Sequence, residues 1–234
     1  MNTRTTNDNP QQDPSTANRI INGDCTGVLK TIADESIDFV LTDPPYLVGY
    51  RDRSGRTIAN DSRPESVLGA FDDVYRVLKP DNFCISFYGW NRVDAFFGAW
   101  RRAGFTPVGH MVWRKNYASS TGFLNARHEQ AYLLAKGRPA KPARPLDDVQ
   151  PWEYTGNHSH PTEKAVSILE PLIRTFSRPG DVVLDPFAGS GSTLVAAALS
   201  GRRYLGIELE SRYCQLAEKR LAGASRFVQR KPAA

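Results

Sequence analysis

The sequence predicts an α/β fold in which a mostly parallel sheet carries helices on both of its faces. Two observations lead to this prediction. Short apolar runs alternate with helical segments through most of the chain, and strands that are separated by helices pair in parallel. The run at 37–42 (IDFVLT) is apolar with little alternation, which is typical of a strand buried on both faces. We therefore expect a seven-stranded sheet.

The expected elements follow one another in a regular order. We predict strands at 19–22, 37–42, 83–88, 106–113, 130–135, 181–184 and 203–207. We predict helices at 25–33, 65–78, 91–103, 162–176, 192–200 and 211–222. Because no internal repeat or second domain is evident, residues 18–228 are expected to form a single domain. Residues 1–17 are polar and lack the apolar segment of a signal peptide, so we expect a disordered tail.

Charge and composition narrow the class of protein. The 234 residues have a formal net charge of +5, which suits a polyanionic partner but is also common in proteins without one. Basic residues gather in two polar segments, one at 51–63 and one at 138–144. No apolar run is long enough to span a membrane. The three cysteines are scattered without C-x-x-C spacing, which argues against a zinc site and favours a reducing compartment.

The segment 185–208 has the features of a nucleoside-binding unit. Gly189 and Gly191 lie in the turn between a predicted strand and a predicted helix, where glycine allows a ligand to approach the backbone closely. Glu208 ends the next strand, where an acidic residue commonly binds ribose hydroxyls. A complete G-x-G-x-x-G and a phosphate-binding lysine are both missing, so we expect an adenosine that carries an amino acid rather than NAD or ATP. A tight turn without a ligand is the alternative.

The segment Asp43–Tyr46 (DPPY) places a carboxylate, two prolines and an aromatic ring at the end of the 37–42 strand. Asp43 and the carbonyl of Pro44 are candidate acceptors for the two hydrogens of an exocyclic amino group, and Tyr46 offers a ring for stacking a base. Acceptors on both N–H bonds localise the nitrogen lone pair, so that a methyl group held on a sulfonium can transfer directly. A proline turn with a capping aspartate is the alternative.

Three motifs together resemble the DNA amino-methyltransferases of bacteria, phages and plasmids. DPPY at 43–46 is similar to the catalytic motif of that family, DPFAGSGS at 185–192 to its S-adenosylmethionine-binding motif, and HPTEKA at 160–165 to a third motif, usually HPTEKP. The catalytic motif precedes the cofactor motif, which is the circularly permuted order of the β class. The resemblance covers roughly residues 19–222. It implies a Rossmann-like methyltransferase fold with S-adenosylmethionine as cofactor.

The resemblance also implies a role for individual residues. The catalytic set is Asp43, Pro44, Pro45 and Tyr46. The cofactor set is Asp24 near the adenine, Glu208 at the ribose, His160, Thr162 and Lys164 near the methionine carboxylate, and Asp43 with the loop residues Asp185, Pro186, Phe187, Ala188, Gly189, Ser190, Gly191 and Ser192. The set for the target base and DNA is Tyr46, Arg51, Arg53, Arg56, Trp113 and Lys115. Trp113 fits a core position equally well, and no metal is expected, because His128 and Glu129 have no evident third ligand.

The resemblance implies methyl transfer to N6 of adenine, because Asp at the first position of the catalytic motif is more common in adenine enzymes and Ser in cytosine enzymes. N4 of cytosine and a DNA-binding regulator without catalysis stay open as alternatives. Families that methylate RNA or protein amides usually carry Asn before Pro-Pro-Tyr.

We expect double-stranded DNA as the partner, with the target base flipped out of the stack. The loops at 47–64 and 116–160 are the candidates for recognition. Small members of the β class often act as dimers, which implies a homodimer. A cytoplasmic, nucleoid-associated location without membrane contact follows from the same resemblance.

Overall fold

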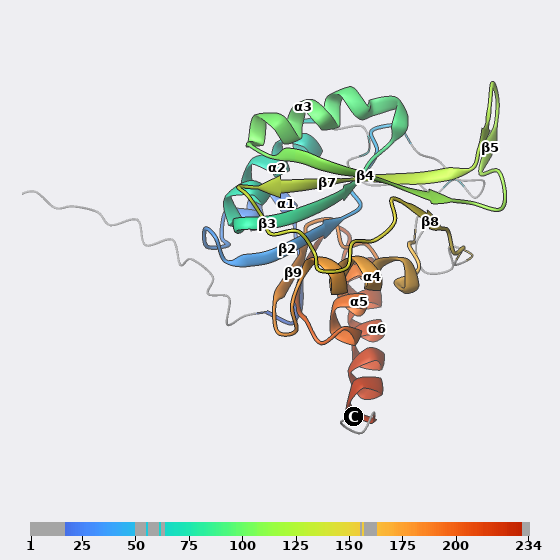
Figure 1. The fold of residues 1–234 in the computed structure, drawn as a ribbon. Coiled ribbons are helices and arrows are strands. Elements are labelled where there is room, and N and C mark those ends of the chain that lie inside the picture. The colour runs from blue at the N-terminus through green and yellow to red at the C-terminus, as the bar shows by residue number, and fades with distance from the viewer. Residues whose placement is uncertain are drawn as a thin grey trace, which may run out of the picture.

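The computed structural model describes residues 17–49, 55, 61, 64–154, 156 and 163–230, with side chains as far as 226. Its centre is an eight-stranded sheet with the order β1-β10-β9-β2-β3-β7-β4-β8 (Figure 1). The strands are β1 (Arg19–Asn22), β2 (Ile37–Thr42), β3 (Leu78–Phe87), β4 (Thr106–Arg114), β7 (His128–Lys136), β8 (Val149–Pro151), β9 (Val182–Asp185) and β10 (Arg203–Glu208). Only β7 runs antiparallel to its neighbours. The predicted α/β class with a mostly parallel sheet is therefore confirmed.

Helices cover both faces of this sheet (Figure 1). The helices are α1 (Cys25–Leu29), α2 (Pro64–Val77), the 3-10 turn η2 (Trp90–Arg92), α3 (Val93–Ala103), α4 (Val166–Phe176), α5 (Ser192–Leu199) and α6 (Ser211–Arg230). The first three α-helices pack together, as do the last three. Successive residues of β2 point to opposite faces: Val40 joins the core beneath the first group, and Phe39 and Leu41 join the core beneath the second.

Several element boundaries differ from the sequence predictions. The sheet has an eighth strand, β8, whose pairing with β4 includes bonds from Val112 N to Asp148 O (2.7 Å) and from Trp152 N to Arg114 O (3.0 Å). A hairpin of β5 (Ser120–Thr121) and β6 (Asn125–Ala126) was also not expected. Strand β3 begins at Leu78, directly after α2, and becomes irregular near Asp81, where φ is 56°. Helix α1 is shorter than predicted and α6 is longer.

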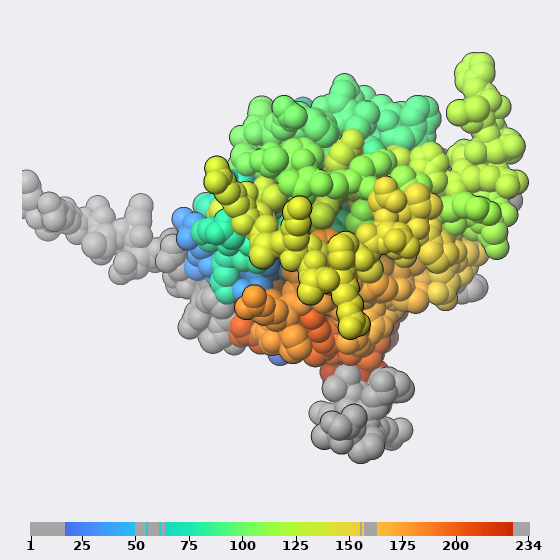
Figure 2. Space-filling view, viewed as in Figure 1, coloured from blue at the N-terminus to red at the C-terminus, as the bar shows by residue number. Residues whose placement is uncertain are grey.

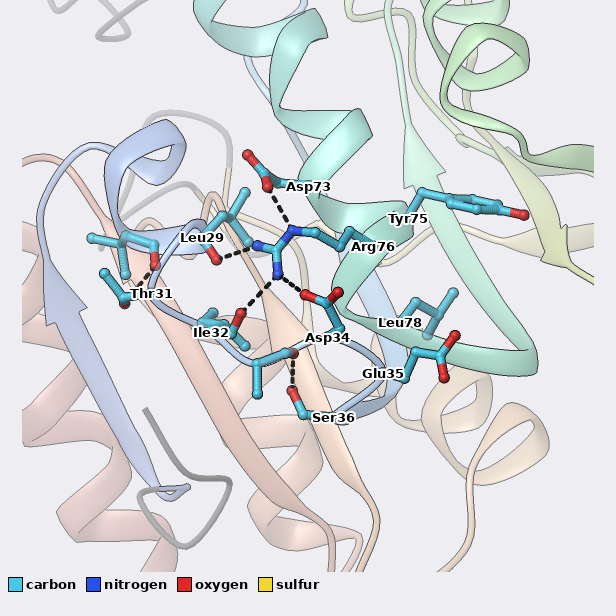
Figure 3. Close-up of polar contacts among 12 residues, drawn as sticks. Leu29, Thr31, Ile32, Asp34, Glu35, Ser36, Asp73, Tyr75, Arg76 and Leu78 are labelled. Carbon is cyan, nitrogen blue, oxygen red and sulfur yellow. Dashed lines mark hydrogen bonds and ion pairs between the residues drawn. The ribbon is translucent and has the colours of Figure 1, made fainter. Parts of the chain in front are cut away.

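Arg76 fixes the entrance to β2 at the amino end of the sheet (Figure 3). Its guanidinium donates to the carbonyls of Leu29 (2.8 Å) and Ile32 (2.9 Å) and to the carboxylates of Asp34 (2.5 Å) and Asp73 (2.9 Å). These bonds satisfy carbonyls that the end of α1 leaves without helical partners. They hold α1, α2 and the start of β2 together.

The opposite, carboxyl edge of the sheet collects the polar strand ends. Strands β2, β9 and β10 run parallel, so Asp43, Asp185 and Glu208 reach the same edge. Strand β4 ends there and the antiparallel β7 begins there. Ligands of open α/β sheets bind at this edge. In the part of the chain that the structure describes, no helix combines the length and apolar character needed to cross a membrane.

Candidate active site

Asp43 lies directly after β2 and is held by two side chains. Tyr46 Oη donates to Asp43 Oδ1 at 2.9 Å, and Lys164 Nζ donates to Oδ2 at 2.5 Å. The Lys164 side chain is only 7% exposed, and its ammonium lies 4.6 Å from the centroid of the Phe87 ring. The catalytic motif and the third motif, far apart in sequence, therefore meet at one carboxylate.

The hydrogen bonds continue from Tyr46 toward β4 and β7. Tyr46 Oη lies 3.5 Å from Glu129 Oε2, and Glu129 Oε1 accepts a short bond from Lys115 Nζ. The result is a row of five side chains, Lys115–Glu129–Tyr46–Asp43–Lys164, in which cations end the row and carboxylates flank the phenol. We did not assign Glu129 a role from the sequence. A signal was present, because Glu129 is the only acidic residue between Asp94 and Asp147.

Burial shifts the pKa of two members of this row, Asp43 and Tyr46. Desolvation raises the pKa of Asp43, and the neighbouring Lys164 charge and the bonds from Lys164 and Tyr46 act against this rise. Burial and the two nearby carboxylates raise the pKa of Tyr46 well above its usual value. The phenol is therefore a neutral hydrogen-bond donor near pH 7. The pKa of Asp43 is raised overall, and Lys164 favours its ionised form against the effect of burial.

The loop after β9 has the backbone that its glycines predict. Gly189 and Gly191 have φ angles of 51° and 82°, and a Cβ on Gly191 would lie 2.7 Å from the Cβ of Ala217. The backbone N–H of Gly189 donates to Glu208 Oε2 at 2.8 Å. The carboxylate that ends β10 therefore holds the loop directly, and its pKa is raised by burial.

Two further acidic residues lie around this loop. Asp185 is buried, accepts from the backbone N–H of Phe187 at 3.1 Å, and has a pKa raised to about 7 by desolvation. Asp24 caps α1 by accepting from Thr26 N at 2.9 Å. The turn before α1 is tied to the Glu208 strand end, because Gly23 N donates to Glu208 O at 2.9 Å. Asp24, two residues after β1, and Glu208, the last residue of β10, thus lie at the ends of neighbouring strands.

A pocket joins the loop to the carboxylate of Asp43. Its lining comes from β2, β3, α4 and the segment before it, and from the end of β9, the start of α5 and the turn between them. The lining residues are Leu41, Thr42, Asp43, Phe87, Glu163, Lys164, Leu169, Asp185, Phe187, Ala188, Gly189, Ser190, Ser192 and Thr193. The structure therefore brings most of the predicted cofactor loop to the same pocket as Asp43. Buried carboxylates on its wall suit a ligand that carries positive charge.

Arg220 of α6 hydrogen-bonds to the loop after β9, and the sequence motifs did not predict this residue. Its Nη1 donates to Ser190 O and Ser190 Oγ, both at 2.8 Å, and to Ser192 Oγ at 3.2 Å. Its Nη2 pairs with Glu163 Oε1 at 2.9 Å, and the Glu163 side chain is 8% exposed. One guanidinium therefore connects the DPFAGSGS loop to the residue before Lys164. No motif in the sequence marks an arginine on this helix.

The remaining predicted residues divide into four groups. Trp113 is 1% exposed and packs on Phe87 with ring centroids 4.9 Å apart, so it belongs to the core behind the site. Lys115 is buried and bound to Glu129 rather than presented to solvent. Pro44 is buried, Pro45 is partly buried, and Pro186 is buried within the loop. The residues Arg51, Arg53, Arg56, His160 and Thr162 lie outside the described residues, as does the predicted tail up to residue 16. The described residues contain no group of three or more side chains placed to hold a metal.

The fold and the pocket define a class: an α/β protein with a glycine-turn pocket at the carboxyl edge of its sheet, beside a carboxylate–tyrosine site. Comparison with known proteins identifies the family. The chain belongs to the N6/N4 DNA methylase family, whose model matches residues 37–219.

The relatives agree with this assignment. The chain is 56% identical to the putative methylase YubD of Escherichia coli K12, over 90% of this chain and 93% of that protein. It is 29% identical to the DNA adenine methyltransferase YhdJ of the same organism, over 90% and 85% of the two chains. A putative DNA modification methylase of Thermus thermophilus, solved with S-adenosylmethionine, has a TM-score of 0.68 at 26% identity, over 88% and 95% of the chains.

The protein is therefore a DNA methyltransferase, and S-adenosylmethionine is its cofactor. The residues present fit this cofactor. The glycine turn leaves backbone groups accessible, the carboxylates of Glu208 and Asp24 beside it are acceptors of the kind that hydroxyl and amino groups require, and Asp185 is a buried carboxylate suited to a cationic ligand.

Proposed function

We propose that the protein transfers a methyl group to N6 of adenine in double-stranded DNA. The observation that carries the proposal is Asp43, fixed between Tyr46 and Lys164 on the wall of the cofactor pocket. An aspartate at this position is the choice that the resemblance associates with adenine. The relative YhdJ, named as a DNA adenine methyltransferase, supports the same base.

The chain's own groups account for activation of the amino nitrogen. An ionised carboxylate has about four acceptor sites on its two oxygens, and Tyr46 and Lys164 each use one. Asp43 therefore retains acceptor capacity for an amino N–H, and the carbonyl of Pro44 is the second acceptor that we assign. Bound S-adenosylmethionine supplies the electrophilic methyl group. The amino nitrogen gives up one proton as it gains that methyl group, and we assign the proton to Asp43 or to water.

We assign the other predicted residues to two tasks, binding of the target base and DNA and binding of the cofactor. Tyr46 stacks on the flipped base, and its hydroxyl is fixed by Asp43 and Glu129. Glu208 and Asp24 bind the ribose and the adenine of the cofactor, and the loop Asp185–Ser192 lines its path. His160 and Thr162 complete the methionine end, and Arg51, Arg53 and Arg56 contact DNA phosphates. Removal of the base from the stack costs a few kcal/mol, which phosphate contacts and stacking offset.

The setting of the enzyme is part of the proposal. We place it in the cytoplasm with the nucleoid, acting on duplex DNA as a homodimer. The family also includes enzymes that act on N4 of cytosine, and this base is the second candidate. A regulator without catalysis is disfavoured, because the described part of the site keeps the whole Asp43–Tyr46–Lys164 arrangement.

Nucleoside analysis tests the choice of base. The purified protein is incubated with unmethylated duplex DNA and S-adenosylmethionine, and the DNA is digested and analysed by mass spectrometry. We expect N6-methyladenine. N4-methylcytosine would keep the mechanism and correct the base. Neither product, together with measured cofactor binding, would reject the proposal in favour of a regulator.

A further inference from the structure

A hairpin extends from the carboxyl edge of the sheet beside the active site. Strands β5 and β6 pair antiparallel, with Ser120 opposite Ala126 and Thr121 opposite Asn125. Their base is held by bonds from Lys115 N to Arg127 O and from Ser119 N to Ala126 O, both 2.8 Å. Figure 1 shows the hairpin projecting beyond the sheet, and Figure 2 shows it standing clear of the rest of that face.

The tip of this hairpin is apolar. It consists of Gly122, Phe123 and Leu124; Phe123 is fully exposed and Leu124 is 84% exposed. These are the two most exposed large apolar side chains among the described residues. The two side chains lie next to each other at the end of a narrow projection, where no core can form around them. Such adjacent exposure marks a contact surface more often than scattered single residues do.

The positive charge around the base of the hairpin favours DNA as its partner. Arg114 and Arg127 at its base are exposed, and no acidic residue occurs from 95 to 128. The base of the hairpin also reaches the active site, because Lys115 binds Glu129, which lies 3.5 Å from Tyr46 Oη. A duplex whose target base enters this site therefore has the hairpin beside it, and its phosphates complement the basic flank.

We propose that Phe123 and Leu124 form an apolar wedge that enters the base stack of duplex DNA next to the target base. Proteins that deform DNA insert side chains of this kind between base steps and unstack them. The wedge rests on the proposed function, because it acts only if the target base must leave a duplex. It fills the space beside the flipped base and so favours the open state.

Two duplexes that contain the mapped methylation site test the wedge. In one the target base is paired, and in the other it faces an abasic site and needs less energy to leave the stack. The variant Phe123→Ala/Leu124→Ala changes exposed side chains only, so the fold is kept. On the paired duplex we expect its kcat/KM to fall about tenfold or more. On the duplex whose target base faces an abasic site, its kcat/KM should stay within about twofold of wild type.

Val108→Ala is the matched control, because Val108 is an exposed apolar residue (53%) of β4 away from the hairpin, and it should behave as wild type on both duplexes. Equal losses of the double variant on the two duplexes, or no loss on either, would overturn the wedge. A lower sedimentation coefficient of the double variant would also overturn it, since the tip would then join two copies of the chain. If wild type methylates no DNA when the site is mapped, that result would instead reject the proposed function.

Discussion

The buried lysine of the third motif acts on the catalytic carboxylate. The resemblance placed Lys164 near the methionine end of the cofactor, and in the structure its ammonium binds Asp43 Oδ2. Both groups are largely buried, and an unpaired carboxylate in such a place tends to take up a proton. We infer that Lys164 keeps Asp43 ionised and able to accept an amino hydrogen.

The pH dependence of Lys164→Met tests this inference. Burial raises the pKa of Asp43 and Lys164 lowers it, so removing the ammonium raises that pKa further. Activity requires the ionised carboxylate and is lost as the pH falls through its pKa. The acidic limb of the kcat profile should therefore move to higher pH in Lys164→Met. Lys164→Arg keeps the charge, so its acidic limb should lie close to that of wild type. An unmoved limb in Lys164→Met would contradict the role.

Among individual site residues, the sequence predicts those that belong to continuous motifs. Asp43–Tyr46 and the loop Asp185–Ser192 are each one short segment, and the structure brings both to the same pocket. Glu129 and Arg220 could not be predicted in the same way, because their partners are distant in sequence and depend on the sheet order. Trp113 shows a different limit, because its position in the sequence fits a core residue and a base contact equally well, and in the structure it is buried.

Among the elements, the buried strands are predicted best. Continuous apolar runs such as β2 and β9 give little choice other than a central strand, and both occur where expected. Strand β8 and the β5–β6 hairpin were missed because their segments are polar and short, and their pairing comes from neighbours rather than from apolar periodicity. Strand β8 and the β5–β6 hairpin are therefore the elements that are hardest to predict from the sequence pattern alone.

Helix α6 links the cofactor loop to the third motif through Arg220. A lysine in its place would keep the charge but could not bridge Ser190 and Glu163 with separate nitrogens. We expect Arg220→Lys to weaken S-adenosylmethionine binding about tenfold, which corresponds to loss of one charge-assisted contact. Isothermal titration calorimetry measures the change. Arg226→Lys, at an exposed position of the same helix, should bind as wild type does, and equal affinity of Arg220→Lys would refute the clamp.

At the scale of the whole molecule, the sheet brings together two motifs that the permuted order places far apart in the sequence. The catalytic motif follows β2 and the cofactor loop follows β9, and these strands are direct neighbours although most of the chain separates them. Asp43 and the loop therefore face one pocket from adjacent strand ends. In the proposed function this geometry divides the work: one strand end activates the substrate, and the next two hold the cofactor.

Asp43→Ala tests that division most directly. The loop, Glu208 and Arg220 do not hydrogen-bond to Asp43, so the dissociation constant for S-adenosylmethionine should stay close to that of wild type. Methyl incorporation into DNA should fall at least about a hundredfold, as is typical when one preorganised catalytic contact is removed. Cofactor affinity is measured by calorimetry and incorporation by transfer of a labelled methyl group. Retained incorporation, or loss of cofactor binding and incorporation together in a folded variant, would contradict the account.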